Sequence, residues 1–318
     1  MVAAASKKAF NLSDIAKCFA DEQAAREKIE AMRWPNGPEC PTCAQTDTVY
    51  RMQKLADSKK PGRPGLLRCR ACKKQFTVTT GTVFEASHIP LSKWLHALYL
   101  LCASKKGMSA HQLHRMLGIT YKSAWFMAHR LRYAMMEGPM AALMTGVIEA
   151  DETYVGAKRK RGAKRGRPGE DSHKTPVVAL VERGTGKVRA RVMPRVTSEN
   201  LKDTITKNVE ASSTLMTDEY AAYKQVGAMY DHNAVNHSAG EYVRADVHTN
   251  TVEGFFSLLK RGINGVYHHV GRGHLDRYCD EFAFRYEHRH ISDGARAEKL
   301  VVGAEGKRLT YRQPSIVV

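Results

Sequence analysis

The sequence predicts an α/β core preceded by two small N-terminal modules. From about residue 146 onward, runs rich in β-branched residues alternate with amphipathic helical segments. Two Cys-x-x-Cys pairs stand near the N-terminus, and helical periodicity fills the stretch between them and the core. We expect a helical segment (1–35), a cysteine-bearing module (36–85), a helix-turn-helix (90–137), the core (145–292) and a C-terminal tail (293–318).

The net charge indicates a polyanionic partner. The 318 residues contain 50 Lys and Arg against 32 Asp and Glu, a formal net charge of +18. Nucleic acid is the default partner for this balance, and a membrane surface is the weaker alternative. No stretch approaches the roughly 18 apolar residues of a membrane span, and residues 1–10 lack the apolar segment of a secretory signal. We therefore expect a cytoplasmic protein whose seven cysteines are metal ligands or free thiols.

The cysteine-bearing module has the spacing of a structural zinc site. Cys40-Pro41-Thr42-Cys43 is followed, after 25 residues, by Cys69-Arg70-Ala71-Cys72. Each pair presents two thiolates from a tight turn, and two pairs complete one tetrahedral shell. A redox role for one Cys-x-x-Cys pair leaves the second unexplained. We predict a zinc ribbon with one structural Zn²⁺ on Cys40, Cys43, Cys69 and Cys72, and no open position for catalysis.

Two helices joined by a short turn follow this module. Ser109 caps a short helix, Gly118-Ile119 forms the turn, and Thr120 caps a longer helix to about Met135. The second helix is expected to expose Lys122, Arg130 and Arg132 to phosphates and base edges. An ordinary helical hairpin is the alternative, and the net charge favours DNA binding.

A strand over Gly146–Gly156 opens the core and carries Asp151 in its middle. Side chains alternate along a strand, so Glu149 and Asp151 share one face. Aspartate is disfavoured inside strands, and an edge position facing water would explain Asp151 without any function. A loop with seven basic and no acidic residues follows at Lys158–Pro168. We expect its Lys158, Arg159, Arg165 and Arg167 to contact the DNA backbone.

Two further acids have partners in the pattern. Asp218 ends a strand over Ser213–Thr217, where ligands gather in open α/β sheets. Glu253 lies on a helix from Val252 to about Ile263, with Asn250 and Lys260 on the same face. Three carboxylates from separate elements suit two divalent metal ions bound by oxygen. A chance coincidence among 32 acids is the alternative.

The order of these residues resembles that of RNase H-like DDE transposases and retroviral integrases. The match is an Asp in the first strand, an Asp after the fourth, a Glu on a helix 34 or 35 residues later, and a basic residue, Lys260, seven further on. More narrowly, the chain resembles bacterial insertion-sequence transposases of the ISXO-like group. The matching stretches are Arg33–Gly37 leading into Cys40–Cys43, Glu149–Gly156, Thr217-Asp218 and His248–Gly254.

This resemblance implies an RNase H-like catalytic core, a mixed β-sheet flanked by helices. It also implies that the core uses Mg²⁺ or Mn²⁺, with two ions on Asp151, Asp218 and Glu253. In such families the neighbouring Asn has also been considered functional, so Asn250 remains open, and its amide offsets less cation charge. The implied reaction is metal-dependent nicking of transposon ends, after which the freed 3′-hydroxyl attacks target DNA.

The implied partners are double-stranded DNA, both transposon ends and target, and further copies of the chain in a homodimer or higher synaptic multimer. The implied location is the nucleoid of a bacterial cytoplasm, with no membrane. Two rival functions are an RNase H-like nuclease without strand transfer and a catalytically inactive zinc-ribbon DNA-binding regulator. The three intact acids argue against the second.

Overall fold

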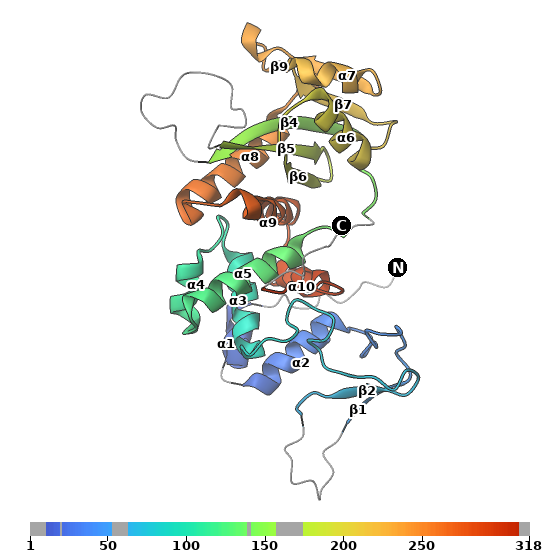
Figure 1. The fold of residues 1–318 in the computed structure, drawn as a ribbon, viewed down its shortest axis with the longest axis vertical. Coiled ribbons are helices and arrows are strands. Elements are labelled where there is room, and N and C mark those ends of the chain that lie inside the picture. Colours follow the sequence, from blue (N-terminus) through green and yellow to red (C-terminus); the bar gives the residue numbers. More distant parts are fainter. Residues whose placement is uncertain (1–10, 20, 53–62, 139–140, 157–173, 312–318) are drawn as a thin grey trace, which may run out of the picture. The chain divides into compact units, whose positions relative to one another are not determined.

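A computed structural model of the chain describes residues 11–19, 21–52, 63–138, 141–156 and 174–311. The chain forms two compact units. One contains the N-terminal residues to Ser104, Met108–Met135 and the residues from Ile291 onward; the other contains Lys105–Gly107 and Met136–His290 (Figure 1). In the described part of the chain, every helix is too short or too polar to span a bilayer.

The first unit is mainly helical. Its helices are α1 (Leu12–Phe19), α2 (Glu22–Arg33), α3 (Leu91–Ala103), α4 (Ala110–Leu117), α5 (Tyr121–Met135) and α10 (Asp293–Gly303). The helical segment predicted over 1–35 contains two helices, because the Asp21 side chain accepts a hydrogen bond from Gln23 N at 2.8 Å and so starts a second one. The α4–α5 turn forms as predicted, with Gly118 in the left-handed region (φ 58°).

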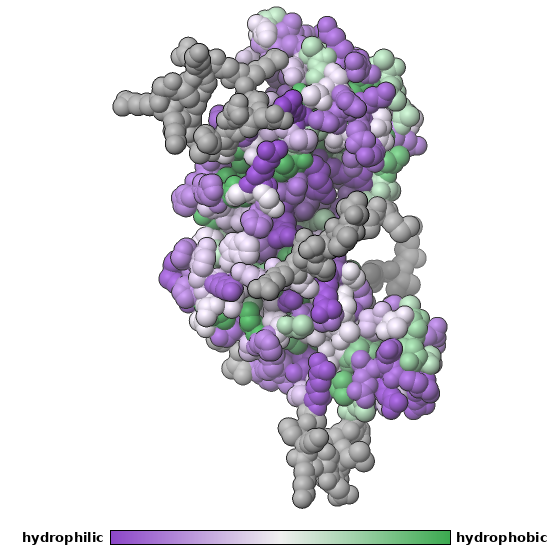
Figure 2. All heavy atoms as spheres, viewed as in Figure 1, coloured by the Kyte–Doolittle hydropathy of each residue, from purple (hydrophilic) through white to green (hydrophobic). Residues whose placement is uncertain are grey.

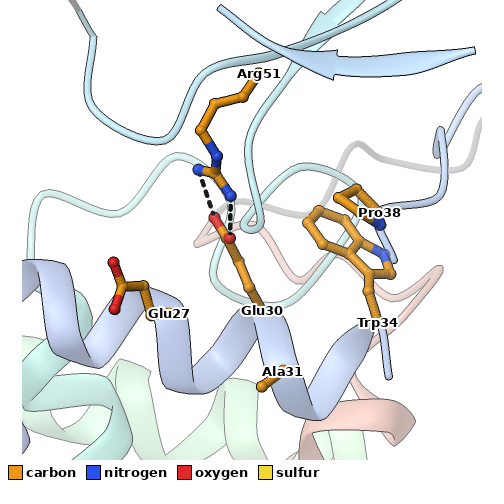
Figure 3. A pocket seen from close by; sticks show the side chains of 6 residues that line it. All are labelled: Glu27, Glu30, Ala31, Trp34, Pro38 and Arg51. Carbon is orange, nitrogen blue, oxygen red and sulfur yellow. Dashed lines mark hydrogen bonds and ion pairs between the residues drawn. The ribbon is translucent and has the colours of Figure 1, made fainter. Parts of the chain in front are cut away.

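A three-stranded antiparallel sheet carries the cysteines. It comprises β1 (Val49–Arg51), β2 (Leu67–Cys69) and β3 (Gln75–Phe76), in that order. Helix α2 is joined to it by a bidentate ion pair between Arg51 and Glu30, with Nη2 and Oε2 2.6 Å apart (Figure 3). The sheet and α2 therefore belong to one packed unit, although our prediction assigned them to separate segments.

The C-terminal segment corrects the prediction of a separate tail over 293–318. Helix α10 packs against α2, α3 and α5, and its Leu300 and Val301 are fully buried. Glu305 accepts a hydrogen bond from the buried Arg33 at 2.9 Å. Apolar side chains along one face of α10 need a partner, and the N-terminal helices supply it. Residues 312–318 lie outside the described part of the chain.

The second unit is built on a five-stranded mixed sheet. The strands are β4 (Val147–Gly156), β5 (Lys174–Glu182), β6 (Val188–Val192), β7 (Thr214–Asp218) and β8 (Asp231–Val235), in the order β6-β5-β4-β7-β8. Strand β5 runs antiparallel to β4 and β6, whereas β7 is parallel to both β4 and β8. The predicted mixed sheet is confirmed. Because β4 is central, a water-facing edge position does not explain Asp151.

Helices cover both faces of this sheet (Figure 1). On one face α6 (Ser198–Asn208) and α7 (Lys224–Gly227) pack over Ile148 and Leu180. On the other, α8 (Asn250–Gly262) and α9 (Leu275–Glu287) pack over Val177 and Ala179. A Cβ on Gly262 would lie 1.9 Å from the Phe282 ring, so only glycine permits this close approach of α8 to α9.

Short elements complete the second unit. They are η1 (Ala221–Tyr223), η2 (His237–Ala239), η3 (Ile263–Tyr267), η4 (Arg272–His274) and the hairpin of β9 (Val243–Arg244) with β10 (Val247–His248). Hydrophilic side chains dominate the face of the molecule seen in Figure 2, and hydrophobic ones appear there in small separate groups.

Candidate functional site

Strand pairing brings two of the predicted acids together. In the parallel pair of β4 and β7, Glu149 lies opposite Met216. Continuing this register by two residues sets Asp151 beside Asp218 on the same face of the sheet. Each carboxylate accepts a backbone hydrogen bond: Asp151 Oδ1 from Glu152 N at 2.7 Å, and Asp218 Oδ1 from Tyr220 N at 3.1 Å.

The first turn of α8 carries the third acid. Glu253 is exposed, and its Oε1 accepts a hydrogen bond from the Thr249 hydroxyl at 3.0 Å. Asn250 and Lys260 are also exposed, three residues before and seven after Glu253. These spacings keep all three side chains on one side of the helix.

The charges of Asp218 and Glu253 act on Asp151. Burial is the largest cause that raises the pKa of Asp151, to about 7, and the negative charges of Glu152, Asp218 and Glu253 raise it further against a backbone hydrogen bond. Burial also raises the pKa of Asp218; Glu219 adds to the rise, while the Tyr220 N–H and His237 oppose it. Desolvated carboxylates that repel one another are typical of cation sites.

The donor set suits a hard divalent cation. In the described part of the chain, no lysine or arginine forms an ion pair with Asp151, Asp218 or Glu253. Their carboxylate oxygens do not all lie within 4.8 Å of one another. Two ions about 3.5–4 Å apart can be held by carboxylates that do not themselves touch. Oxygen ligands with uncompensated negative charge fit Mg²⁺ better than a soft metal ion.

Sequence reasoning missed His237, which lies beside this cluster. Its Nε2 is 4.0 Å from Glu253 Oε1. Glu219 fixes the turn by accepting hydrogen bonds from the backbone of His237 and Ser238 at 2.9 and 3.0 Å. The Ser238 hydroxyl, followed by backbone N–H groups, lowers the pKa of Glu219 to about 2. No spacing rule in the sequence connects this turn to Asp218, because the contact depends on the fold.

The four cysteines form the second site. All four Sγ atoms lie within 4.8 Å of one another, with Cys40–Cys72 and Cys43–Cys69 each 3.6 Å apart. A tetrahedral zinc ion with Zn–S bonds of about 2.3 Å requires sulfur atoms roughly 3.8 Å apart. Hydrogen bonding from the Thr48 hydroxyl is the first cause that lowers the pKa of Cys69, to about 6. The cluster is therefore consistent with zinc.

Comparison with known proteins identifies the family. Residues 143–287 match the ISXO2-like transposase domain, and residues 20–75 match the transposase zinc-ribbon domain. A Halobacterium salinarum protein described as an uncharacterized protein in transposable element ISH50 is 30% identical over 284 residues, covering 85% of this chain and 92% of the relative. The chain belongs to the ISXO2-like DDE transposases.

The catalytic core domain of BIV integrase is a more distant likeness, with 13% identity and a TM-score of 0.30, covering 44% of this chain and 84% of that one. The family and the fold class predicted from the motifs are confirmed.

Part of the predicted DNA-binding surface of this transposase is wrong. Arg130 and Arg132 are only 6% and 2% exposed, so neither is available to phosphates. Arg130 donates to Leu309 O at 3.1 Å and to Glu85 O at 2.9 Å, because the returning C-terminal segment covers α5. Lys122 is exposed, with its Nζ 4.8 Å from the Tyr311 ring centroid. Lys158, Arg159, Arg165 and Arg167 lie outside the described residues.

A pocket of about 310 Å³ lies in the first unit, between α2 and the zinc ribbon. Figure 3 places Trp34 and Pro38 on one side and the Arg51–Glu30 ion pair on the other. The other lining residues are Glu27 and Ala31. Its two glutamates disfavour a phosphate ligand, so this pocket is no candidate for the DNA-processing site.

The electrostatics of Asp151 predict a trade-off with stability. Asp151→Asn should stabilise the metal-free chain by about 1–3 kcal/mol at pH 8, because it removes a desolvated charge. The folded pKa of about 7 exceeds the ordinary value of 3.8, so wild type loses stability as pH rises from 4 to 7. The advantage of the variant should therefore shrink as pH falls through this window.

Thermal unfolding in EDTA at several pH values measures this difference. Asp203→Asn is the control, because Asp203 is exposed and pairs only with Lys207 at 2.7 Å on the surface of α6. It should change stability little at any pH. A destabilised Asp151→Asn at pH 8 would contradict the electrostatic description of the site.

Proposed function

We propose that this chain is a DNA transposase that binds the terminal inverted repeats of an insertion sequence, nicks the ends and joins them to target DNA. Two observations support the proposal: the parallel register of β4 and β7 sets Asp151 beside Asp218, and the charge of Glu253 on α8 raises the pKa of Asp151. Membership of the DDE family also supports the proposed transposase function. Hydrolysis at an element end breaks a phosphodiester bond and frees a 3′-hydroxyl. This hydroxyl attacks a target phosphodiester directly and displaces the 3′-oxygen of the target strand, without a covalent protein intermediate.

The three acids would hold two Mg²⁺ or Mn²⁺ ions. When bound, such ions stabilise the charge on the attacking and leaving oxygens of the phosphodiester. Two observations favour Glu253 over Asn250 as the third ligand: Glu253 raises the pKa of Asp151, and a carboxylate offsets more cation charge than an amide. Asn250, one turn earlier on the helix, is left to hydrogen-bond the substrate.

DNA contacts would come from several basic residues. Lys260 projects from the same face of α8 as Glu253, where a phosphate near the acids is within reach of a long side chain. Lys122 on α5 and the basic residues Lys158, Arg159, Arg165 and Arg167 would neutralise the backbone elsewhere. Two transposon ends must be held for joining, so we propose a homodimer or higher synaptic multimer on double-stranded DNA.

Two rival functions make different predictions. A nuclease without strand transfer would nick end-containing DNA and leave the 3′-hydroxyl unjoined. An inactive zinc-ribbon regulator would bind DNA and cut nothing. Incubation of the full chain with labelled end DNA, a target plasmid and Mg²⁺ separates the three, because only a transposase produces joined end-target product.

Replacing any of the acids should abolish chemistry and spare binding. We expect Asp151→Asn, Asp218→Asn and Glu253→Gln each to reduce nicking and strand transfer at least about 100-fold. Duplex binding in EDTA should remain within a few fold of wild type, because other residues contact the DNA. Asn250→Ala tests the remaining ligand choice, and a smaller loss than for Glu253→Gln is expected. Near-normal nicking by all three acid variants would refute the metal site.

The zinc ribbon should hold one ion per chain. Native mass spectrometry of reduced protein should detect one Zn²⁺, lost in Cys40→Ser and Cys72→Ser and retained in Cys279→Ala. Loss of the ion should unfold the 36–85 region, because metal binding is folding free energy in such modules. Loss of zinc should weaken DNA binding, whereas the folding of the second unit should change little. A carefully reduced preparation without zinc would contradict this assignment.

Lys260 should contribute one phosphate contact. Lys260→Ala should weaken end binding and cleavage together and lower the salt slope of binding by about one unit. Metal affinity should not change. Arg261 is the matched control: it points about 100° away around the helix, and its Nε donates to Ser257 O at 3.1 Å. Equal and negligible effects of Lys260→Ala and Arg261→Ala would leave Lys260 an ordinary surface residue.

A further inference from the structure

A buried glutamate connects the strand that bears the first acid to the helix that bears the third. Glu149 lies on β4 two residues before Asp151, on the same face, and is 0% exposed. We propose that Glu149, held by Arg183, is a positioning residue that sets Glu253 relative to Asp151. The inference rests on the proposed metal-binding function of these two acids.

The Glu149 carboxylate caps α8 from outside the helix. Its Oε2 accepts hydrogen bonds from the backbone N–H of Thr251 at 2.7 Å and Val252 at 3.0 Å, and its Oε1 accepts one from the Thr251 hydroxyl at 2.7 Å. These amides lie in the first turn, where a helix has no internal acceptors. The local cap residue, Thr249, makes no side-chain cap bond, because its hydroxyl donates to Glu253. Glu149 therefore takes the capping role.

Arg183 fixes the other side of this carboxylate. Its Nε is 2.5 Å from Glu149 Oε1. Its two Nη groups donate to Asp246 O and His248 O, each at 2.7 Å. Arg183 directly follows β5, and its own N–H donates to Val147 O at 2.9 Å. The Glu149–Arg183 pair thus holds the residues before α8 and the first turn of α8 against strands β4 and β5.

The connection from acid to acid is short. Asp151 stands two residues from Glu149 on a strand, and Glu253 follows Val252 directly on a helix. Both elements are regular, so the Glu149–Val252 hydrogen bond fixes the offset between the two acids. Glu149 itself is not a ligand, because it is fully buried and both of its oxygens already accept hydrogen bonds. Its role is to orient a ligand, and such partners typically affect metal affinity about 10–100-fold.

The test uses the full metal-free chain and Mn²⁺ alone as the probe. Glu149→Gln keeps the shape, but it removes the charge and replaces an acceptor oxygen with an NH₂ group. We expect faster hydrogen exchange at Thr251 and Val252, and Mn²⁺ affinity lowered about 10–100-fold by electron paramagnetic resonance titration. Glu149→Asp restores the charge on a shorter side chain and should recover part of the affinity.

Glu281→Gln is the matched control. Glu281 is also 0% exposed and accepts hydrogen bonds from Arg285 at 2.7 Å and Tyr267 at 2.6 Å, but it lies on α9. Its loss should lower the melting temperature without weakening Mn²⁺ binding. If Glu149→Gln does not fold, Arg183→Lys provides the same test from a partly exposed position, because Lys keeps the charge and loses the fork of donors.

The outcomes separate this inference from the proposed function. If Asp151→Asn abolishes Mn²⁺ binding while Glu149→Gln and Arg183→Lys bind like wild type, the positioning role is overturned and the metal site stands. If Asp151→Asn leaves Mn²⁺ binding intact, the proposed metal site itself fails. Equal losses of affinity in Glu149→Gln and Glu281→Gln would indicate general destabilisation and would also overturn the positioning role.

Discussion

The parallel pairing of β4 with β7 is the constraint on which the candidate site depends. Parallel neighbours need a crossover between them, and here the crossover consists of β5, β6 and α6. This long crossover pairs Glu149 with Met216, and the same register continued by two residues sets Asp218 beside Asp151. A slip of one residue would turn one of the two carboxylates to the opposite face. The apolar residues of the same strands prevent that slip, because Ile148 and Leu215 are both fully buried.

Acidic residues of the second unit fall into two groups, which differ in the number of hydrogen-bond donors around the carboxylate. Glu149 and Glu219 are surrounded by hydrogen-bond donors, so each serves as an anchor for a turn or a helix start. Asp151 and Asp218 accept few hydrogen bonds and have raised pKa values. The difference is one of donors rather than burial, since Glu149 is the most buried of the four. Carboxylates with few hydrogen-bond donors are the ones available to bind a cation.

Much of this organisation could be predicted from local patterns. The cysteine pairs, the helix-turn-helix and the order of the three acids all depend on short spacings that a sequence displays directly. The exposure of Arg130 and Arg132 was predicted wrongly, since both are buried. Arg130 is covered by a segment near Leu309, far away in the chain. The separate C-terminal tail was wrong for the same reason. A periodic helix indicates that one face is buried and leaves its partner unidentified.

Glu149 illustrates what a sequence cannot supply. In the chain it is one more acid on the polar face of a strand, next to a better candidate in Asp151. Its capping role depends on Thr251, 102 positions later, because Glu149 accepts a hydrogen bond from the backbone N–H of that residue. The second anchor acid, Glu219, was missed in the same way, since its partners are backbone amides of the η2 turn. Backbone donors have no signature in the side-chain pattern, so capping between distant elements appears only once the fold is known.

The ion pair of the buried Glu149 with the partly exposed Arg183 is better explained by the positioning of α8 than by a gain in stability. Removing a carboxylate and a guanidinium from water is costly, and well-packed apolar side chains often serve as well or better in their place. Apolar substitutes, however, would leave the N–H groups of Thr251 and Val252 without an acceptor. They would also leave α8 held only by its apolar face, which could shift over Val177 and Ala179. Hydrogen bonds are directional where apolar contacts are not. A helix that must present an acid at a fixed offset from Asp151 therefore gains from a polar attachment at its start, even at some expense in folding free energy.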